Sequence, residues 1–199
     1  MFILGLTGSL AMGKSATAQM FVDEGVPLHD ADAVVHRLYD GEATAAIEAA
    51  FPGTTANGKV DRTKLGKRVL GDAAAIKRLE QIVHPMVTAA SAKFLAEAEA
   101  SGAPVAVLDV PLLFETSGDK RCDAVVVVSA PAELQRRRAL ERPGMTEDKF
   151  AAIVGKQISD EEKRRRADFV VDTSQGFDHA RQQVREILRA VAKMPKRRR

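Results

Sequence analysis

The chain has 199 residues, which fits one domain that can bury a core without disulfide or metal staples. Hydrophobic residues make up 45% and charged residues 29%, a composition that excludes a mostly disordered or fibrous chain. The net charge is +3, but five basic residues lie in positions 193–199, so the other 192 residues carry −2. The single cysteine, Cys122, excludes an intrachain disulfide framework and a Cys-rich zinc site.

Short apolar runs alternate with helical patterns along the chain. Each run is continuously apolar, which favours strands covered on both faces, and the alternation with helices predicts a mainly parallel α/β sheet. The expected strands are 2–7, 26–29, 105–108, 124–128 and 169–171. The expected helices between them are 14–24, 31–39, 132–141 and 177–192.

Two longer stretches interrupt this alternation. Some 75 residues after the second run contain no strand-like pattern and predict helices over 44–51, 62–70 and 73–101. We expect Pro85 to kink or split the last of these helices. The second stretch, about 131–167, is helical, rich in Arg and Glu, and interrupted by Pro143-Gly144. Both stretches are predicted insertions on the sheet.

A phosphate-binding loop is predicted directly after the first strand. Residues 8–15, Gly-Ser-Leu-Ala-Met-Gly-Lys-Ser, match G-x-x-x-x-G-K-[ST] between a strand and a helical pattern, as that motif requires. Backbone N–H groups of such a loop, with the following helix N-terminus, attract phosphates. We expect Lys14 to reach the β- and γ-phosphates and the Ser15 hydroxyl to bind Mg²⁺. A glycine-rich turn that binds nothing is the alternative.

The nucleotide is expected to be ATP. Guanine-binding proteins with this loop usually carry an Asn-Lys-x-Asp motif, but the one asparagine here, Asn57, is followed by Gly58. A Ras-like GTPase is therefore excluded.

Two carboxylates follow the second expected strand. Asp30 and Asp32 face the same way if the chain is extended, and one of them is placed to accept the proton of an attacking hydroxyl. Helix capping by Asp30 or Asp32 is the alternative, and the two roles are compatible. His36 lies one helical turn after Asp32, either as its partner or as a surface residue.

A further acid ends the third strand run. Asp109 after four apolar residues matches the Walker-B pattern of an Asp near Mg²⁺, although such patterns are common. The segment that follows, 110–115, is apolar and closes with Glu115; a buried loop under the sheet is the alternative interpretation.

Arginines gather in the second helical stretch. Arg138 and Arg142 share a helix face and suit phosphoryl oxygens. For Arg136, Arg137 and the run 163–166 the sequence favours a solvated, salt-bridged surface instead. The tail 196–199 is expected to be disordered and without a catalytic role.

Together these residues resemble one family, the dephospho-coenzyme A kinases, over about 170 residues. The Asp-Ala-Asp and Asp-x-Pro-Leu-Leu-Phe-Glu elements are more specific than the phosphate loop. The match runs through residues 5–15, Asp30 to Asp32, His84-Pro85, Asp109 to Glu115, Gln135, Arg138, Arg142, Gln157 and Ala167 to Asp172.

The resemblance implies an α/β P-loop NTP-hydrolase-type fold of three layers with five parallel strands. It implies a single kinase domain over 1–199, with an acceptor-binding helical insertion at about 31–102 and a lid at about 131–167. The core is then about 1–30, 103–130 and 168–192, and the basic tail is 193–199. The implied reaction transfers the γ-phosphate of ATP to the ribose 3′-hydroxyl of dephospho-CoA, the last step of coenzyme A synthesis.

The resemblance also implies roles for particular residues. Asp32 is the implied general base, and the other implied catalytic residues are Lys14, Arg138 and Arg142. The implied Mg²⁺ ligands are Ser15 and Asp109. The implied nucleotide-binding residues are Gly8, Ser9, Leu10, Ala11, Met12, Gly13, Lys14, Ser15 and Ala16. The implied acceptor-binding residues are Asp30, Asp32, His84, Asp109, Pro111, Leu112, Leu113, Phe114 and Glu115.

The chain departs from the family pattern in two places. The family loop is richer in glycine and serine, and Ser9, Ala11 and Met12 fit there if their φ angles are negative. Thr173 stands where the family often has Asn, which leaves the adenine contacts near 172–176 open.

Two other functions were weighed. One is another small-molecule P-loop kinase, which phosphorylates a nucleoside or nucleotide and uses the same donor chemistry. Only the acceptor site distinguishes it from a dephospho-CoA kinase. A regulatory or nucleic-acid-binding ATPase is disfavoured, because the body is acidic and aromatic residues for base stacking are scarce. We expect no nucleic-acid or membrane partner, a monomer with an oligomer left open, and, with no signal-peptide pattern before Lys14, a cytoplasmic location.

Overall fold

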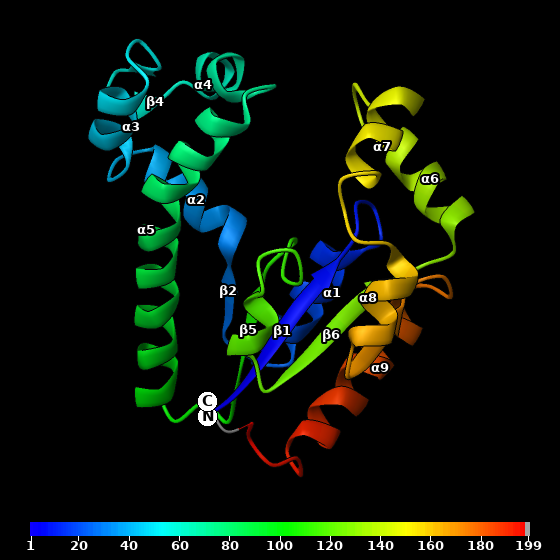
Figure 1. The fold of residues 1–199 in the computed structure, drawn as a ribbon. Helices are drawn as coiled ribbons and strands as arrows, with labels where there is room; N and C mark the ends of the chain where they lie inside the picture. The colour runs from blue at the N-terminus through cyan, green and yellow to red at the C-terminus, as the bar shows by residue number, and fades with distance from the viewer. Residues whose placement is uncertain (198–199) are drawn as a thin grey trace. The chain divides into compact units, whose positions relative to one another are not determined.

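A five-stranded sheet of order β2-β5-β1-β6-β7 organises the larger part of the molecule (Figure 1). The computed structural model describes residues 1–197. The strands are β1 (Phe2–Gly8), β2 (Leu28–Asp30), β5 (Val105–Asp109), β6 (Ala124–Ser129) and β7 (Phe169–Asp172). β1 pairs in parallel with β5 and β6, and β6 pairs in parallel with β7. The predicted P-loop α/β fold with a parallel sheet is therefore confirmed.

The chain divides into two compact units. Unit 1 contains Met1–His29 and Ala98–Arg199, and unit 2 contains Asp30–Glu97. Unit 1 has helices on both faces of its sheet. The helices of this unit are α1 (Lys14–Asp23), α6 (Ala132–Leu140), α7 (Glu147–Val154), α8 (Asp160–Arg166) and α9 (Phe177–Val191), with a 3₁₀ turn, η1, at Gly118–Arg121. α1 and α9 pack on one face of the sheet, and α8 lies beside β6.

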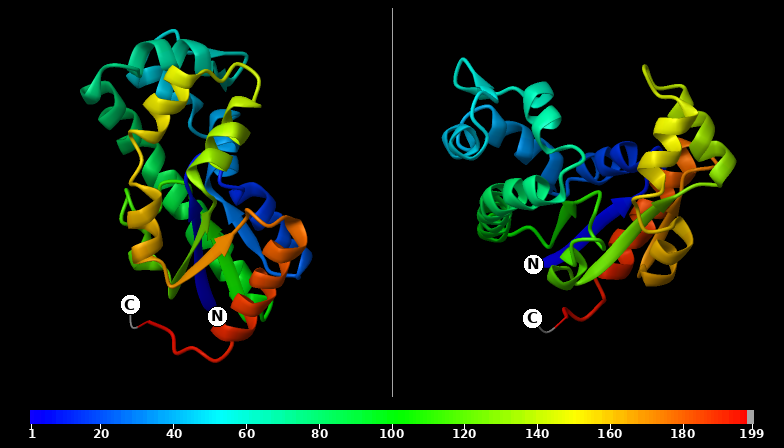
Figure 2. Two further views of the ribbon diagram at one scale, coloured as in Figure 1. Left: turned by 90° about the vertical axis from the view of Figure 1, so that its right-hand side faces the viewer. Right: turned by 45° about the horizontal axis from the view of Figure 1, so that its top comes forward.

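Alternation along the strands builds two core layers in unit 1. Leu4 and Leu6 of β1 point into one layer, which Phe21 of α1 and Val184 of α9 close from the outside. On the other face, a side chain on Gly5 would meet Leu113 and Cys122 at under 3 Å, so the loop after β5 lies directly on the sheet. Figure 2 shows this sheet and its helices from two further sides. All residues of β1, β5 and β6 are buried, as their continuously apolar sequences predict.

Unit 2 is mainly helical and has its own core. Its helices are α2 (Ala31–Tyr39), α3 (Thr44–Ala50), α4 (Arg62–Val69) and most of α5 (Ala73–Ala100). Buried side chains from all four meet in one cluster, among them Val34, Ile47, Leu65 and Val83.

The expectation of no strand in this region is wrong. β3 (Thr55–Ala56) and β4 (Lys59–Val60) form a short antiparallel hairpin. Asn57 and Gly58 join the strands with φ angles of 52° and 74°. Asn-Gly is the turn sequence that accepts two positive φ angles, so the signal was present but the flanking strands are too short to show alternation.

Of the two outcomes expected at Pro85, the split is wrong, since α5 runs unbroken through it, and the kink stays a prediction. Proline removes the N–H that would bond to the carbonyl four residues earlier, on Gln81. Both Pro85 and Gln81 are exposed, so water is available to that carbonyl. No helix within residues 1–197 is both long and apolar enough to cross a membrane.

Candidate active site

The phosphate loop joins the carboxyl end of β1 to the N-terminus of α1. Gly13 caps α1 with φ 97°, and a side chain there would meet Thr173 at about 3.0 Å. A side chain on Gly8 would lie 2.8 Å from the carbonyl oxygen of Val128, so both glycines are required. The first N–H groups of α1 have no acceptor within the helix. The loop thus presents a cluster of backbone donors, which is the chemistry that binds phosphate.

The loop is strained at one residue. Ala11 has φ 62°, in the left-handed region, so the condition of a negative φ, under which it would fit the family loop, is not met at this position. The N–H of Met12 donates to the carbonyl of Ser9 at 3.2 Å and closes the turn around Ala11. The surrounding contacts, and not local preference, therefore determine this conformation.

Lys14 and Asp109 are brought together at the loop. Lys14 Nζ lies 2.7 Å from Asp109 Oδ1, and their side chains are 16% and 4% exposed. The pairing follows from the topology, because β5 lies next to β1 and both carboxyl ends meet at one edge of the sheet. An ammonium has three donors, so Lys14 can keep Asp109 and still donate to a phosphate oxygen.

A cavity of about 260 Å³ lies beside the loop. It is lined by Gly13, Ala16, Thr17, Met20, Arg138, Thr173, Gly176, Phe177 and Ala180. The sequence pointed to the 172–176 region but missed Phe177, which is 72% exposed at the start of α9. An exposed aromatic ring at the rim of a mostly apolar cavity is suited to a planar base.

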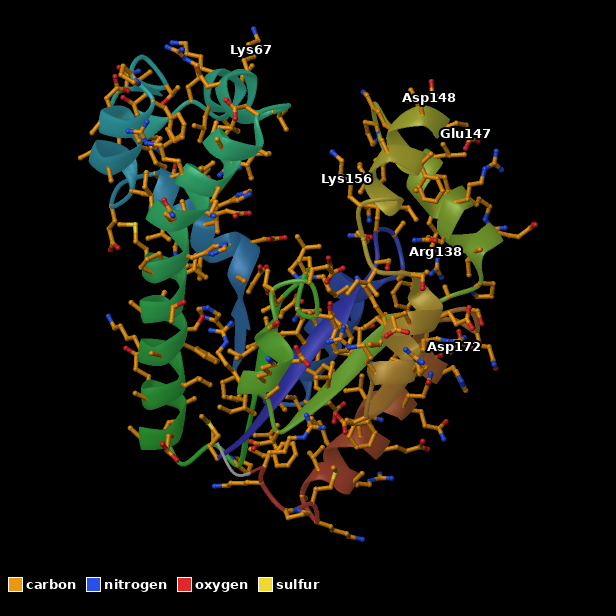
Figure 3. The ribbon with its side chains drawn as sticks, in the orientation of Figure 1. Lys67, Arg138, Glu147, Asp148, Lys156 and Asp172 are labelled. Atoms are coloured by element: carbon orange, nitrogen blue, oxygen red, sulfur yellow. The ribbon has the colours of Figure 1, made fainter. Side chains whose placement is uncertain are left out.

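Arg138 is part of this cavity and Arg142 is not. Arg138 donates from Nη1 to Thr173 Oγ1 and from Nη2 to the Thr173 carbonyl, both at 2.8 Å. Thr173 in turn donates to the carbonyl of Met12 in the phosphate loop at 2.8 Å. Figure 3 labels Arg138 on α6 and Asp172 at the end of β7. Arg142 is exposed after the end of α6, and the predicted catalytic role of both arginines stays a prediction.

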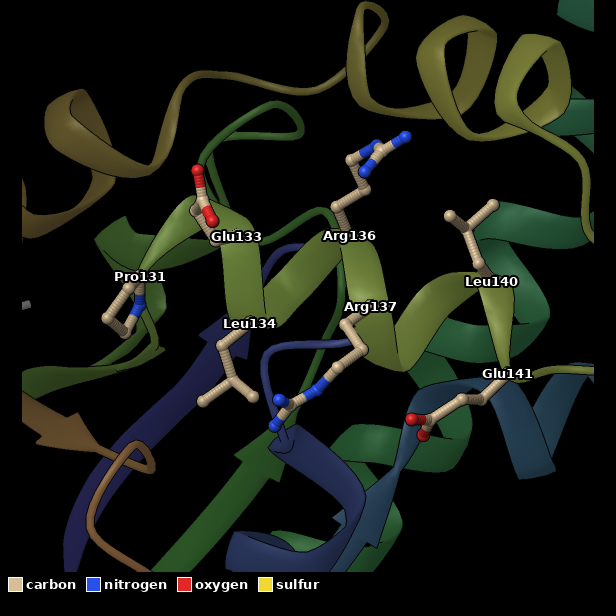
Figure 4. Close-up of a pocket in the computed structure, with 7 residues that line it drawn as sticks. All are labelled: Pro131, Glu133, Leu134, Arg136, Arg137, Leu140 and Glu141. Atoms are coloured by element: carbon tan, nitrogen blue, oxygen red, sulfur yellow. The ribbon is translucent and has the colours of Figure 1, made fainter.

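A larger hollow of about 730 Å³ lies along α6 (Figure 4). Its lining consists of Pro131, Glu133, Leu134, Arg136, Arg137, Leu140 and Glu141. These residues belong to one helix and the residue on either side of it, and none is a predicted site residue. None of them belongs to the phosphate loop, whereas Gly13 of the loop lines the smaller cavity.

The remaining arginines are mostly as expected. Arg136 pairs with Glu147 of α7, and Arg165 pairs with Glu162 of its own helix. Lys163 contradicts the expectation of a solvated run, because its side chain is completely buried. Arg197 contradicts the expected disorder of the tail: it pairs with Asp168 at 2.8 Å. The rest of that expectation, at 198–199, lies outside the described residues.

The segment after β5 is partly structural. Leu113 and Phe114 are buried, with Arg166 lying 4.2 Å from the centre of the Phe114 ring. Glu115 Oε1 accepts from the N–H of Ile158 and lies 3.1 Å from Lys163 Nζ. Pro111 and Leu112 are more exposed. The predicted acceptor contacts of these residues stay predictions.

The other predicted site residues belong to unit 2. Asp30 caps α2 by accepting from the N–H of Ala33 at 3.0 Å, which confirms the capping interpretation for this residue. Asp32 is exposed in the first turn of α2, and His84 is exposed on α5. The Arg62 guanidinium donates from Nη1 to Nε2 of His36, at 3.0 Å. The roles of Asp32 and His84 in catalysis and acceptor binding stay predictions.

The parallel sheet, the phosphate loop and its lysine define a P-loop nucleotide-binding protein. The model of one family in this class, dephospho-CoA kinase, matches residues 2–179. The chain is 66% identical over its whole length to a dephospho-CoA kinase of Bradyrhizobium diazoefficiens, and covers 100% of that protein. It is 55% identical to one of Brucella melitensis, with 98% of each chain covered.

Solved structures agree with the fold. The crystal structure of TT1252 from Thermus thermophilus superposes with a TM-score of 0.86 at 31% identity, covering 96% of this chain and 97% of that one. Dephospho-CoA kinase from Campylobacter jejuni gives 0.67 at 24% identity, covering 96% and 98%, and supports the fold alone. The chain belongs to the dephospho-CoA kinase family and is a phosphotransferase of coenzyme A synthesis.

Proposed function

We propose that this protein transfers the γ-phosphoryl group of ATP to the ribose 3′-hydroxyl of dephospho-CoA, which gives coenzyme A and ADP. This is the last step of coenzyme A synthesis. The family match over residues 2–179 carries the proposal for the acceptor. The phosphate loop with its Lys14–Asp109 pair supports the proposal for the donor.

The donor half of the reaction follows from unit 1. The backbone N–H groups of the loop and the Lys14 ammonium would hold the phosphates, and the cavity beside Thr173 would hold the base. Positioning and charge neutralisation are most of what a protein supplies for phosphoryl transfer. In our proposal, Arg138 and Arg142 would add positive charge near the phosphates of the nucleotide.

Mg²⁺ fits the oxygen donors at the loop. Ser15 is exposed in the first turn of α1, and Asp109 ends β5. A hydroxyl and a carboxylate are hard oxygen ligands, and Mg²⁺ in kinases is usually held by one or two such groups together with phosphates. Residues 1–197 contain no group of three or more His, Cys, Asp or Glu side chains placed to hold a metal. When bound, Mg²⁺ would neutralise charge on the phosphate oxygens.

We assign the general base to Asp32. The carboxylate would accept the proton of the ribose 3′-hydroxyl as that oxygen attacks the γ-phosphorus, and ADP leaves. The exposed position of Asp32 gives substrate free access to it. We further propose that the protein acts as a monomer in the cytoplasm, without a nucleic-acid or membrane partner.

An assay of ADP release with different acceptors tests the reaction. We expect Mg²⁺-dependent ADP release with dephospho-CoA and little with adenosine or AMP. Lys14→Met serves as the control, since it should abolish release with every acceptor. Turnover only with a nucleoside or nucleotide other than dephospho-CoA would contradict the proposal and favour another small-molecule kinase.

A further inference from the structure

Two glutamine side chains hold the backbone of Leu10 in the phosphate loop. The N–H of Leu10 donates to Gln157 Oε1 at 3.2 Å, and its carbonyl accepts from Gln135 Nε2 at 2.8 Å. A backbone N–H needs an acceptor and a carbonyl needs a donor, so the orientation of each amide follows from its partner. Both polar groups of one loop residue are thus bonded to side chains that the loop itself does not supply.

The two glutamines come from opposite ends of the segment 131–167. Gln135 is in the middle of α6 and is only 6% exposed. Gln157 lies between α7 and α8, next to Ile158, whose N–H donates to Glu115. Because Glu115 also pairs with the buried Lys163 of α8, the backbone that follows Gln157 is tied to the loop after β5.

The residue that follows Leu10 explains why the loop needs this support. Ala11 has a positive φ angle of 62°, a conformation that is strained for a residue other than glycine. A loop with that strain tends to relax when it is not held from outside. The glutamines hold it before Ala11, and the Thr173 hydroxyl, bonded to the Met12 carbonyl at 2.8 Å, holds it after Ala11.

We propose that Gln135 and Gln157 are positioning residues that keep the phosphate loop in its phosphate-receiving shape, and that they couple this shape to both ends of the segment 131–167. The inference rests on the proposed binding of ATP phosphates at the loop. Coupling is reciprocal, so bound phosphates also favour the arrangement of the segment in which both glutamines reach Leu10.

Methionine substitutions test the effect on nucleotide binding. Methionine keeps the length of glutamine without its amide, and Gln182→Met is a matched control, because Gln182 lies on α9 and bonds only to Glu186 of the same helix in the part described. We expect Gln135→Met and Gln157→Met to raise the ATP dissociation constant roughly tenfold, the scale of a lost buried hydrogen bond. The control should remain within twofold of the unsubstituted protein.

The double substitution tests whether the two glutamines act on the same residue. If they do, Gln135→Met with Gln157→Met weakens ATP binding by less than the product of the single effects. Fully multiplicative effects, or dissociation constants within twofold of the unsubstituted protein for both single variants, would overturn the proposal. Calorimetric titration with ATP needs no acceptor, so the result is independent of whether dephospho-CoA is the substrate.

Hydrogen exchange at the Leu10 amide provides a readout that a general loss of stability would not reproduce. In the nucleotide-free protein, Gln157→Met should expose this amide to exchange, whereas Gln157→Glu keeps a carboxylate oxygen as its acceptor and should preserve protection. Gln135→Glu instead places an acceptor against the Leu10 carbonyl, so it should raise the ATP dissociation constant as Gln135→Met does. Equal Leu10 exchange in Gln157→Met and Gln157→Glu would contradict the assigned hydrogen bond.

Discussion

At the scale of single residues, Asp32 carries the most specific mechanistic claim. Asp32→Asn keeps the shape of the side chain but removes the proton acceptor. We expect kcat to fall by about 10²–10⁴, the usual contribution of general base catalysis, while the ATP dissociation constant changes little. Steady-state kinetics and ATP titration of the variant check this. A kcat within threefold of the unsubstituted enzyme would show that another group accepts the proton.

Asp30→Asn is the matched control for Asp32, since asparagine is also a good helix cap. The carboxylate of Asp30 bonds to the N–H of Ala33, and asparagine can accept the same bond through its amide oxygen. The Asp30→Asn variant should therefore keep its folding stability. If Asp32→Asn also keeps its folding stability but loses kcat, the loss comes from catalysis and not from helix capping.

Ala11 is the second residue at which a single change is informative. Ala11→Gly relieves the left-handed strain at φ 62° but adds conformational freedom to the unfolded chain. The two effects oppose each other, and we expect a net gain in stability of about 0.5 kcal/mol. Chemical denaturation measures it. A loss of more than about 1 kcal/mol would mean that the methyl group of this buried residue contributes more to packing than its strain costs.

At the scale of elements, the pair formed by Lys163 and Glu115 connects α8 to the loop after β5. Lys163 Nζ and Glu115 Oε2 make no hydrogen bond to the described residues. The ammonium and the carboxylate therefore stabilise each other mainly through the ion pair between Nζ and Oε1. Lys163→Met should lower the free energy of unfolding by about 3 kcal/mol, because it leaves the carboxylate without its counter-charge.

A second substitution in the same pair separates charge from packing. Lys163→Met combined with Glu115→Met removes both charges and should recover most of the loss. Urea denaturation of the single and double variants provides the comparison. A double variant that is less stable than Lys163→Met would show that Glu115 stabilises the fold mainly through the Ile158 N–H.

Glu48 connects α3 to the β3–β4 hairpin in unit 2. The Thr55 hydroxyl and the Gly53 N–H donate to its carboxylate and hold the pKa of Glu48 below the ordinary glutamate value. A lowered pKa in the folded state stabilises the fold above the ordinary pKa, and this contribution is lost as pH falls through the lowered value. Glu48→Gln should therefore lower the melting temperature more at pH 7 than at an acidic pH below the ordinary glutamate pKa. An equal difference at both pH values would contradict the role of the charge.

At the scale of the whole molecule, the net charge of +3 divides into an acidic body and a basic C-terminal end. The Arg197 guanidinium bonds to both oxygens of Asp168, and its backbone N–H bonds to Asp123. Arg197→Ala should cost no more than about 1 kcal/mol, as an exposed ion pair, and should leave kcat unchanged. A large loss of activity in this variant would show that the C-terminal end takes part in catalysis after all.

The sequence by itself determined the features that depend on neighbouring residues. The continuously apolar runs predicted the buried parallel strands, and the Gly-Lys-Ser ending located the phosphate loop. The Asp30 cap and the start of α2 were also readable, because a cap and its helix lie within a few positions of each other. The Asn57-Gly58 turn was equally local, but its two-residue strands gave no pattern to recognise.

Only the tertiary structure decided the features that depend on residues far apart in the chain. Leu10 meets Gln135 and Gln157 across 125 and 147 positions, and no local pattern records such contacts. The charged run around Lys163 predicted a solvated helix, whereas the side chain is buried against Glu115. No sequence pattern indicated the positive φ angle of Ala11. Packing overrides local preference at these positions because distant groups supply the hydrogen bonds and counter-charge that make each arrangement stable.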